Sequence, residues 1–182
     1  MYEVEIKAKV KDPDVIRRKL LSAKYLGKRI EIDEYFNFDC EGGCCRDFSV
    51  TDEAVRLRKS DGKCVLTYKG PRLDPSAKVR EEIEVELNSC DAIRQILEKL
   101  CLKSVFVVEK TRERWKWEDI TIAIDNVKGL GWFIELEKVV SSNEELENAK
   151  NELLLKLREI VPDAEVVSKT YLELLIEKIS DR

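Results

Sequence analysis

Residues 104–139 read SVFVVEKTRERWKWEDITIAIDNVKGLGWFIELEKV, and this stretch decides the fold class. It predicts three strands, at 104–116, 119–127 and 131–139, joined by short turns at Glu118-Asp119 and Lys128-Gly129. Turns this short join antiparallel neighbours, because a parallel connection needs roughly a dozen residues or more. Apolar and charged residues alternate along the strands, so the sheet has one apolar and one charged face.

The same alternation predicts five more strands, at residues 2–10, 30–38, 54–59, 64–69 and 78–87. Asp61-Gly62 is a strong signal for a two-residue hairpin between two of them. Amphipathic helices are predicted from Pro13 to a stop at Gly27, and then at residues 90–100, 142–161 and 168–179. Their apolar stripes are suited to cover the apolar face of the sheet. The chain is therefore expected to be one α+β domain over residues 1–182.

Composition excludes several classes of protein. The 182 residues are 43% hydrophobic and 38% charged, and 33 Lys+Arg against 37 Asp+Glu give a net charge of −4. A nonspecific nucleic-acid binder would need a basic excess, and a disordered acidic chain would have few apolar residues. No apolar run approaches the roughly 18 residues that span a bilayer, and the first ten residues are too charged for a signal peptide. We expect a cytoplasmic protein with no nucleic-acid or membrane partner.

The chain has no histidine, which narrows the chemistry. This absence excludes imidazole bases, Ser-His and Cys-His pairs, and metal sites that contain histidine. Acid–base work must then fall to carboxylates, Lys, Tyr, Cys or metal-bound water. Six cysteines form no CxxC pair, and the closest cluster is Cys40, Cys44 and Cys45. Ordinary thiols explain this cluster better than zinc, and disulfides are left open for an environment that tolerates them.

The signs of the charges are sorted by strand. Cations concentrate at 56–58, 69 and 110–114, whereas acids dominate at 3–5, 82–86 and 135–137. An ordinary sheet with its polar side in water explains charge on any one strand, but it does not explain this sorting. About eight strands would also leave long edges unless the sheet curls shut. We therefore predict an eight-stranded antiparallel closed barrel, with helices packed on its outside and the charged faces lining a tunnel.

Such a tunnel would bind a polyanion together with a divalent cation. Its basic side would bind polyanion oxygens, with Arg giving bidentate contacts and Lys point charges. Its acidic side would hold Mg²⁺ or Mn²⁺, which prefer carboxylate and water oxygens and bridge phosphates.

Six motifs in order lie in register with these strand faces: Glu3-x-Glu5-x-Lys7, Arg56-x-Arg58, Lys69 in LTYKGP, Arg80-x-Glu82-x-Glu84, Lys110-x-Arg112, and Glu135-x-Glu137 after Asp125. In this set the chain resembles the CYTH superfamily of class IV adenylyl cyclases, thiamine triphosphatases and inorganic triphosphatases. DEYFNF at 33–38, RDFSVTDEAVRLRK at 46–59 and KTYLELL at 169–175 are most similar to the class IV cyclase branch. The chain departs from relatives in the loop at 41–45, which reads EGGCC where they often place a histidine.

The resemblance implies a triphosphate tunnel, a small-molecule triphosphate substrate and dependence on Mg²⁺ or Mn²⁺. The candidate metal ligands are Glu3, Glu5, Glu82, Glu84, Asp125, Glu135 and Glu137. The candidate phosphate ligands are Lys7, Arg56, Arg58, Lys69, Arg80, Lys110 and Arg112. Arg114 continues the same face, beyond the expected centre of the tunnel.

The expected reaction is conversion of ATP to cyclic AMP and pyrophosphate. One alternative is a triphosphatase that hydrolyses inorganic, thiamine or nucleoside triphosphate, and another is a non-catalytic polyphosphate- or nucleotide-binding module. The candidate catalytic residues are Glu3 and Glu5, through the metal, and Tyr35 and Lys69, which would orient or deprotonate an attacking water. Whether two chains form a homodimer is left open.

Overall fold

A computed structural model describes residues 2–39, 46–72 and 78–181. The cluster of Cys40, Cys44 and Cys45, and with it the loop at 41–45, lies outside the described residues. The strands are β1 (Tyr2–Val10), β2 (Lys24–Phe38), β3 (Ala54–Ser60), β4 (Lys63–Lys69), β5 (Lys78–Arg80), β6 (Glu82–Leu87), β7 (Leu102–Trp117), β8 (Ile120–Val127) and β9 (Gly131–Val140). The helices are α1 (Pro13–Lys19), α2 (Phe48–Thr51), α3 (Cys90–Lys99), a short 3₁₀ turn η2 (Asn143–Glu145), α4 (Leu146–Ile160) and α5 (Tyr171–Ser180).

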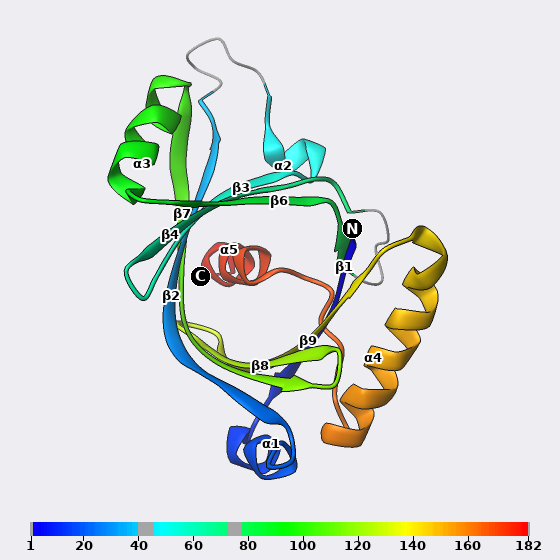
Figure 1. The fold of residues 1–182 in the computed structure, drawn as a ribbon. Helices are drawn as coiled ribbons and strands as arrows, with labels where there is room; N and C mark the ends of the chain where they lie inside the picture. Colours follow the sequence, from blue (N-terminus) through cyan, green and yellow to red (C-terminus); the bar gives the residue numbers. More distant parts are fainter. Residues whose placement is uncertain (1, 40–45, 73–77, 182) are drawn as a thin grey trace.

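The strands form one antiparallel sheet in the order β5-β1-β9-β8-β7-β2-β3-β4-β6, strongly curled (Figure 1). Its two edge strands, β5 and β6, are separated by Glu81 alone, so the sheet has eight strands when they are counted as one. The expected closed barrel is wrong, because the described strands form an open ladder. The strand at 78–87 is divided at Glu81: β5 pairs with β1 and β6 pairs with β4, so the covalent chain spans the last gap.

The chain departs from prediction between α1 and β2. The first helix ends at Lys19 and β2 begins at Lys24, so Gly27 lies inside a strand and does not cap a helix. Gly27 has a φ of +120°, a conformation that favours glycine, and it marks a shift in the register between β2 and β7. The segment 24–29 lacks the alternation of the rest of β2, which is why its sequence did not indicate a strand.

Most of the helices cover the outer, apolar face of the sheet, as predicted (Figure 1). The largest core joins Ile6 of β1, Ile122 of β8 and Leu136 of β9 to Leu153 of α4. A smaller core lies under α3, where Leu97 packs with other buried side chains, namely Phe36, Leu57 and Leu102. A disulfide between Cys64 and Cys90 ties β4 to the start of α3.

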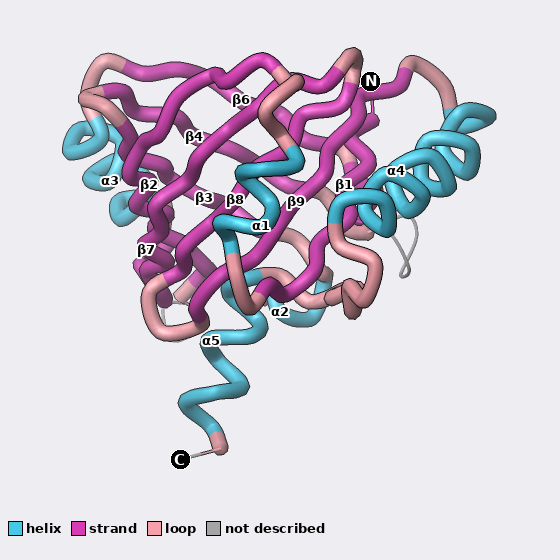
Figure 2. The backbone as a smooth tube through the Cα atoms, turned by 90° about the horizontal axis from the view of Figure 1, so that it is seen from below, coloured by secondary structure: helices cyan, strands magenta, loops and turns pink. Residues whose placement is uncertain are grey.

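Helix α5 is the exception, because it begins at one end of the curled sheet and projects away from that end (Figure 2). Tyr171 at its start is buried with Val108 and Phe133, and Leu172 and Leu175 pack against the same group. The expectation that every helix packs on the outside is therefore wrong. Helix α5 does have an apolar stripe, but the stripe packs against Val108 of β7 and Phe133 of β9. This end of the sheet is called the α5 mouth below.

The packing of α4 gives a test of the core. Leu153 is fully buried against the sheet, whereas Leu155 on the same helix is 68% exposed. We expect Leu153→Ala to lower the free energy of unfolding by about 2–5 kcal/mol, because it leaves a cavity. Leu155→Ala should change it by less than about 0.5 kcal/mol. Urea unfolding followed by circular dichroism measures both, and equal effects would contradict this placement of α4.

Candidate functional site

The charged face of the sheet encloses a cavity of about 700 Å³. Every predicted site residue except Lys7 and Asp125 lines it. These residues are Glu3, Glu5, Tyr35, Arg56, Arg58, Lys69, Arg80, Glu82, Glu84, Lys110, Arg112, Glu135 and Glu137. Strand parity brings them together, because alternate residues on a strand point to the same side. The inward direction of the charged faces, which the sequence predicted, is confirmed.

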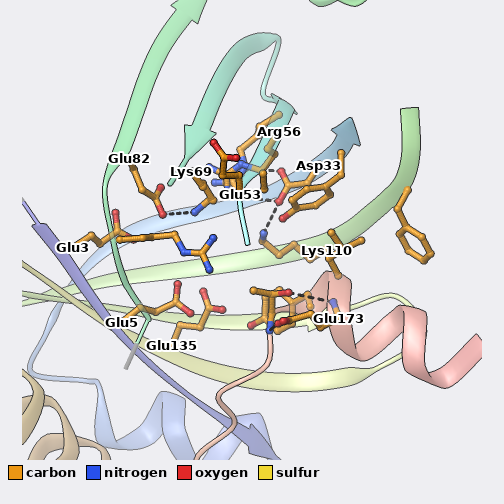
Figure 3. Close-up of a pocket in the computed structure, with 18 of the residues that line it drawn as sticks. Glu3, Glu5, Asp33, Glu53, Arg56, Lys69, Glu82, Lys110, Glu135 and Glu173 are labelled. Atoms are coloured by element: carbon orange, nitrogen blue, oxygen red, sulfur yellow. Dashed lines mark hydrogen bonds and ion pairs between the residues drawn. The ribbon is translucent and has the colours of Figure 1, made fainter. Parts of the chain in front are cut away.

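The register of β1 with its neighbours sets the acidic side of the cavity. Glu5 lies opposite Glu137 of β9, and Glu3 lies opposite Arg80 of β5. Glu5 and Glu135 point into the same space in Figure 3. Carboxylates from two adjacent strands therefore meet at one wall.

Two acids of β2 neutralise cations at the centre. Lys110 Nζ lies 3.0 Å from Asp33 (Figure 3). Arg58 Nε donates to Asp33 at 2.6 Å, and Lys110 Nζ also lies 3.1 Å from Glu31. Burial alone would raise the pKa of Asp33, but Lys110 and Arg58 outweigh it and hold that pKa well below its usual range. Burial is outweighed at Glu31 in the same way, chiefly by Lys110 and Arg112, so its pKa is also lowered.

Asp33 and Glu31 were missed as site residues. Both share the strand parity of Tyr35, which the sequence did place on the charged face. That parity was the signal that could have found them. Their presence means that Arg58, Lys110 and Arg112 already have protein partners, so a bound anion would share these cations.

Lys7 and Asp125 are buried and do not line the cavity. The Asp125 carboxylate accepts hydrogen bonds from Arg112 and, at 2.9 Å, from the hydroxyl of Tyr171. Lys7 Nζ lies 4.2 Å from the centre of the Tyr171 ring, a cation–π contact. Glu135 also contacts Arg112. The two predicted residues that do not line the cavity thus support Tyr171 and Arg112, which do.

Across the cavity, β3, β4 and β6 present cations paired to acids. Lys69 Nζ contacts Glu82 (Figure 3). Arg56 Nη2 lies 3.0 Å from Glu84. Burial, reinforced by Arg56, lowers the pKa of Lys69 despite the pair with Glu82. A lowered pKa favours the neutral amine, which can accept a proton. Tyr35 lines the same cavity, and its pairing with Lys69 stays a prediction.

Burial and neighbouring carboxylates raise the pKa values of Glu3 of β1 and Glu137 of β9. Burial, with Glu137 and Glu82 nearby, raises the pKa of Glu3 to about 8. Burial and then Glu5 raise the pKa of Glu137. Within residues 2–39, 46–72 and 78–181 no three acidic or cysteine side chains are yet arranged to hold a metal ion. The oxygen donors nevertheless suit a divalent cation, which would relieve the repulsion.

The α5 mouth adds apolar side chains to the cavity, beside the charged side chains of Asp52, Arg72 and Glu173. The cavity there is lined by the side chains of Tyr35, Phe36, Phe48, Phe106, Leu172 and Ile176. Phe48 is held in place because Asn37 accepts a hydrogen bond from its backbone N–H at 3.0 Å. Arg72 joins this mouth to α5, since it contacts Asp52 at 2.9 Å and Glu173 at 3.2 Å. None of these contacts was predicted, because they depend on where α5 docks.

The comparisons with known proteins agree with this geometry. The model of the CYTH domain matches residues 1–171. The chain belongs to the CYTH domain family. It is 44% identical over 178 residues to the Methanocaldococcus jannaschii protein "Putative adenylate cyclase MJ0240". The matched region covers 96% of this chain and 98% of that protein. The resemblance found in the sequence is confirmed.

Two solved structures extend the comparison. The PH1819 protein from Pyrococcus horikoshii has a TM-score of 0.86 and 40% identity, over 97% of this chain and 99% of that one. A Hippeastrum protein, HpAC1, described as a putative adenylyl cyclase with a dominant triphosphatase activity, has a TM-score of 0.70. At 18% identity, over 97% of this chain and 96% of that one, HpAC1 supports the fold alone. In this CYTH chain, no described helix has the length and apolarity that crossing a membrane requires.

The raised pKa of Glu3 gives this CYTH domain a pH signature. The unfolded chain has the ordinary value of 4.5 and the folded chain about 8, so the folded state binds more protons between these values. The free energy of unfolding should therefore fall, by an amount on the order of a few kcal/mol, as pH rises from about 5 to 8.

Urea unfolding of Glu3→Gln in metal-free buffer tests this signature. The variant should lose most of that pH dependence, whereas Glu165→Gln, an exposed control, should keep it. A wild-type slope in Glu3→Gln would show that Glu3 is not the group responsible.

Proposed function

We propose that this CYTH protein binds an organic triphosphate in the cavity and converts ATP to cyclic AMP and pyrophosphate. The observation that supports this best is the division of one cavity into a charged interior and an apolar α5 mouth. Inorganic triphosphate would need only the charged part. A nucleotide also has a base, which the aromatic and aliphatic side chains at the mouth would contact.

The cations would bind and orient the phosphates. Arg56, Lys69 and Arg80 come from three strands and face one space, so they can contact several phosphate oxygens at once. Positive charge that is already fixed in a partly closed site stabilises charge developing on the pyrophosphate as it leaves. Arg58 and Lys110, held by Asp33, would add charge without having to reorganise.

A divalent ion, Mg²⁺ or Mn²⁺, would be held by Glu3, Glu5 and Glu137 and would supply further neutralisation of phosphate charge. Glu82, Glu84, Asp125 and Glu135 are engaged with Lys69, Arg56 and Arg112, so they are weaker candidates for this role. The raised pKa values of Glu3 and Glu137, and the position of Glu5 opposite Glu137, support this choice of ligands.

In the cyclase reaction the ribose 3′-hydroxyl attacks the α-phosphorus, and the bond to the bridging oxygen breaks to release pyrophosphate. The proton of the hydroxyl must be accepted, and no histidine is present. Lys69, whose pKa burial lowers, is the candidate acceptor: its neutral amine would take the proton and thereby become the cation that contacts the departing pyrophosphate, with Tyr35 orienting the attacking group. These two roles are part of the proposal.

A triphosphatase is the second candidate. The charged part of the cavity, which would bind a triphosphate whether or not it has an organic group, favours it. The same cations would bind the phosphates, but water would attack the terminal phosphorus. Binding without turnover would indicate the third possibility, a nucleotide- or polyphosphate-binding module.

Product analysis decides among these functions. The chain is incubated with ATP and Mg²⁺ or Mn²⁺, and the products are resolved by chromatography. We expect cyclic AMP and pyrophosphate. ADP and phosphate would replace the cyclase with the triphosphatase. Glu5→Gln should lower turnover by about 100-fold or more, because it removes a proposed metal ligand, and unchanged turnover would contradict that role.

The apolar mouth is tested by a matched pair on α5. Ile176 and Ile179 lie on the same helix and are similarly exposed, at 46% and 58%, but only Ile176 lines the cavity. Ile176→Ala should weaken ATP binding about threefold to tenfold, since it removes apolar contact with the base. It should leave tripolyphosphate binding unchanged, and Ile179→Ala should affect neither. Calorimetric titration measures both ligands; equal weakening of the two by Ile176→Ala would rule out a base at this mouth.

A further inference from the structure

We propose that Arg114 and Arg29 form a separate subsite for the distal phosphate, at the end of the cavity opposite the α5 mouth. This inference rests on the proposed function. The subsite gives the bound nucleotide a direction: the organic group lies at the α5 mouth, and the phosphate tail points along β7 toward Arg114.

The register of β7 places these residues far from α5. Phe106, which lines the α5 mouth, lies opposite Tyr35, whereas Arg112 lies opposite Arg29 and Arg114 lies opposite Gly27. At about 3.3 Å per residue, Arg114 is roughly 26 Å along the strand from Phe106. Both Arg29 and Arg114 still line the same cavity. The cavity therefore runs from an apolar end to a basic end.

Arg114 stands apart from the other inward cations. Arg112 contacts Asp125 and Glu135, and Arg29 contacts Glu31 at 2.6 Å. Arg114 forms no ion pair with any residue in the described part of the chain. Its surroundings add positive charge, because Arg29 and Arg112 lie near it, with Glu137 as the main nearby acid that is not already paired.

Burial and the neighbouring arginines lower the pKa of Arg114, which is the expected result of crowding like charges. An anion between Arg29 and Arg114 would relieve this repulsion and could be bound by both guanidinium groups.

The basic end also reaches the surface. Arg29 lines a second hollow outside the cavity, together with Lys28, Ile30, Asp61 and Thr111. Glu137 lies near Arg114, so a metal held by Glu137 would neighbour the same phosphates.

Nucleotides of different length test the subsite, because the base at the α5 mouth fixes the position of the phosphate tail. ADP and ATP are titrated by calorimetry, with EDTA present to prevent turnover. Arg114→Gln should weaken ATP binding about 10-fold or more, since it removes a charged hydrogen-bond donor, and should weaken ADP binding less than 2-fold. Arg114→Lys should recover part of the ATP affinity. Arg158→Gln, an exposed arginine on α4, is the matched control and should change neither.

The outcomes separate the subsite from the proposed function. Loss of ATP affinity alone supports the subsite. Equal loss for ATP and ADP, or no loss for either, overturns it while the proposed function stands. A wild-type chain that binds neither nucleotide, nor inorganic tripolyphosphate, overturns the proposed function itself. Circular dichroism and thermal melting of Arg114→Gln confirm that the variant is folded.

Discussion

Charge balance inside a curled sheet is the constraint on which the rest of the structure depends. Burying an ion costs several kcal/mol unless an opposite charge compensates it. At the centre of the cavity the compensation is internal, because Asp33 and Glu31 hold Arg58 and Lys110. At the acidic wall it is incomplete, as the raised pKa values of Glu3 and Glu137 show. The protein is built so that its interior charge is best balanced when something else is bound.

Strand parity explains how much of this could be predicted from the sequence. Alternation alone placed Glu3, Arg56 and Lys110 on the charged face, and the sorting of signs indicated that this face looks inward. The break at Glu81 could not be predicted, because Lys78 to Leu87 alternate as one strand and only the register shows that they pair with two partners. Glu31 was missed because acids on a mainly apolar strand look like ordinary surface charge.

The position of α5 was beyond the sequence for a different reason. Its amphipathic stripe predicts that the helix packs against an apolar surface. Any part of the apolar outer face of the sheet would fit that prediction, so the stripe does not specify where α5 packs. The structure shows the deciding contacts, which are the hydrogen bond from Tyr171 to Asp125 and the ion pair of Glu173 with Arg72. Through them α5 gives the cavity an apolar mouth. The contrast between this mouth and the charged interior is what favours an organic triphosphate over an inorganic one.

The cyclase and the triphosphatase differ only in which nucleophile reaches which phosphorus, so membership of the CYTH family does not distinguish them. Both require that a triphosphate sits inside the curled sheet with a metal at its acidic wall. The most direct measurement is a crystal structure with tripolyphosphate and Mn²⁺, in which anomalous scattering locates the metal. The account predicts manganese bound by Glu3, Glu5 and Glu137, and phosphates on Arg56, Lys69 and Arg80. Manganese and phosphate found only on the outer surface would contradict it.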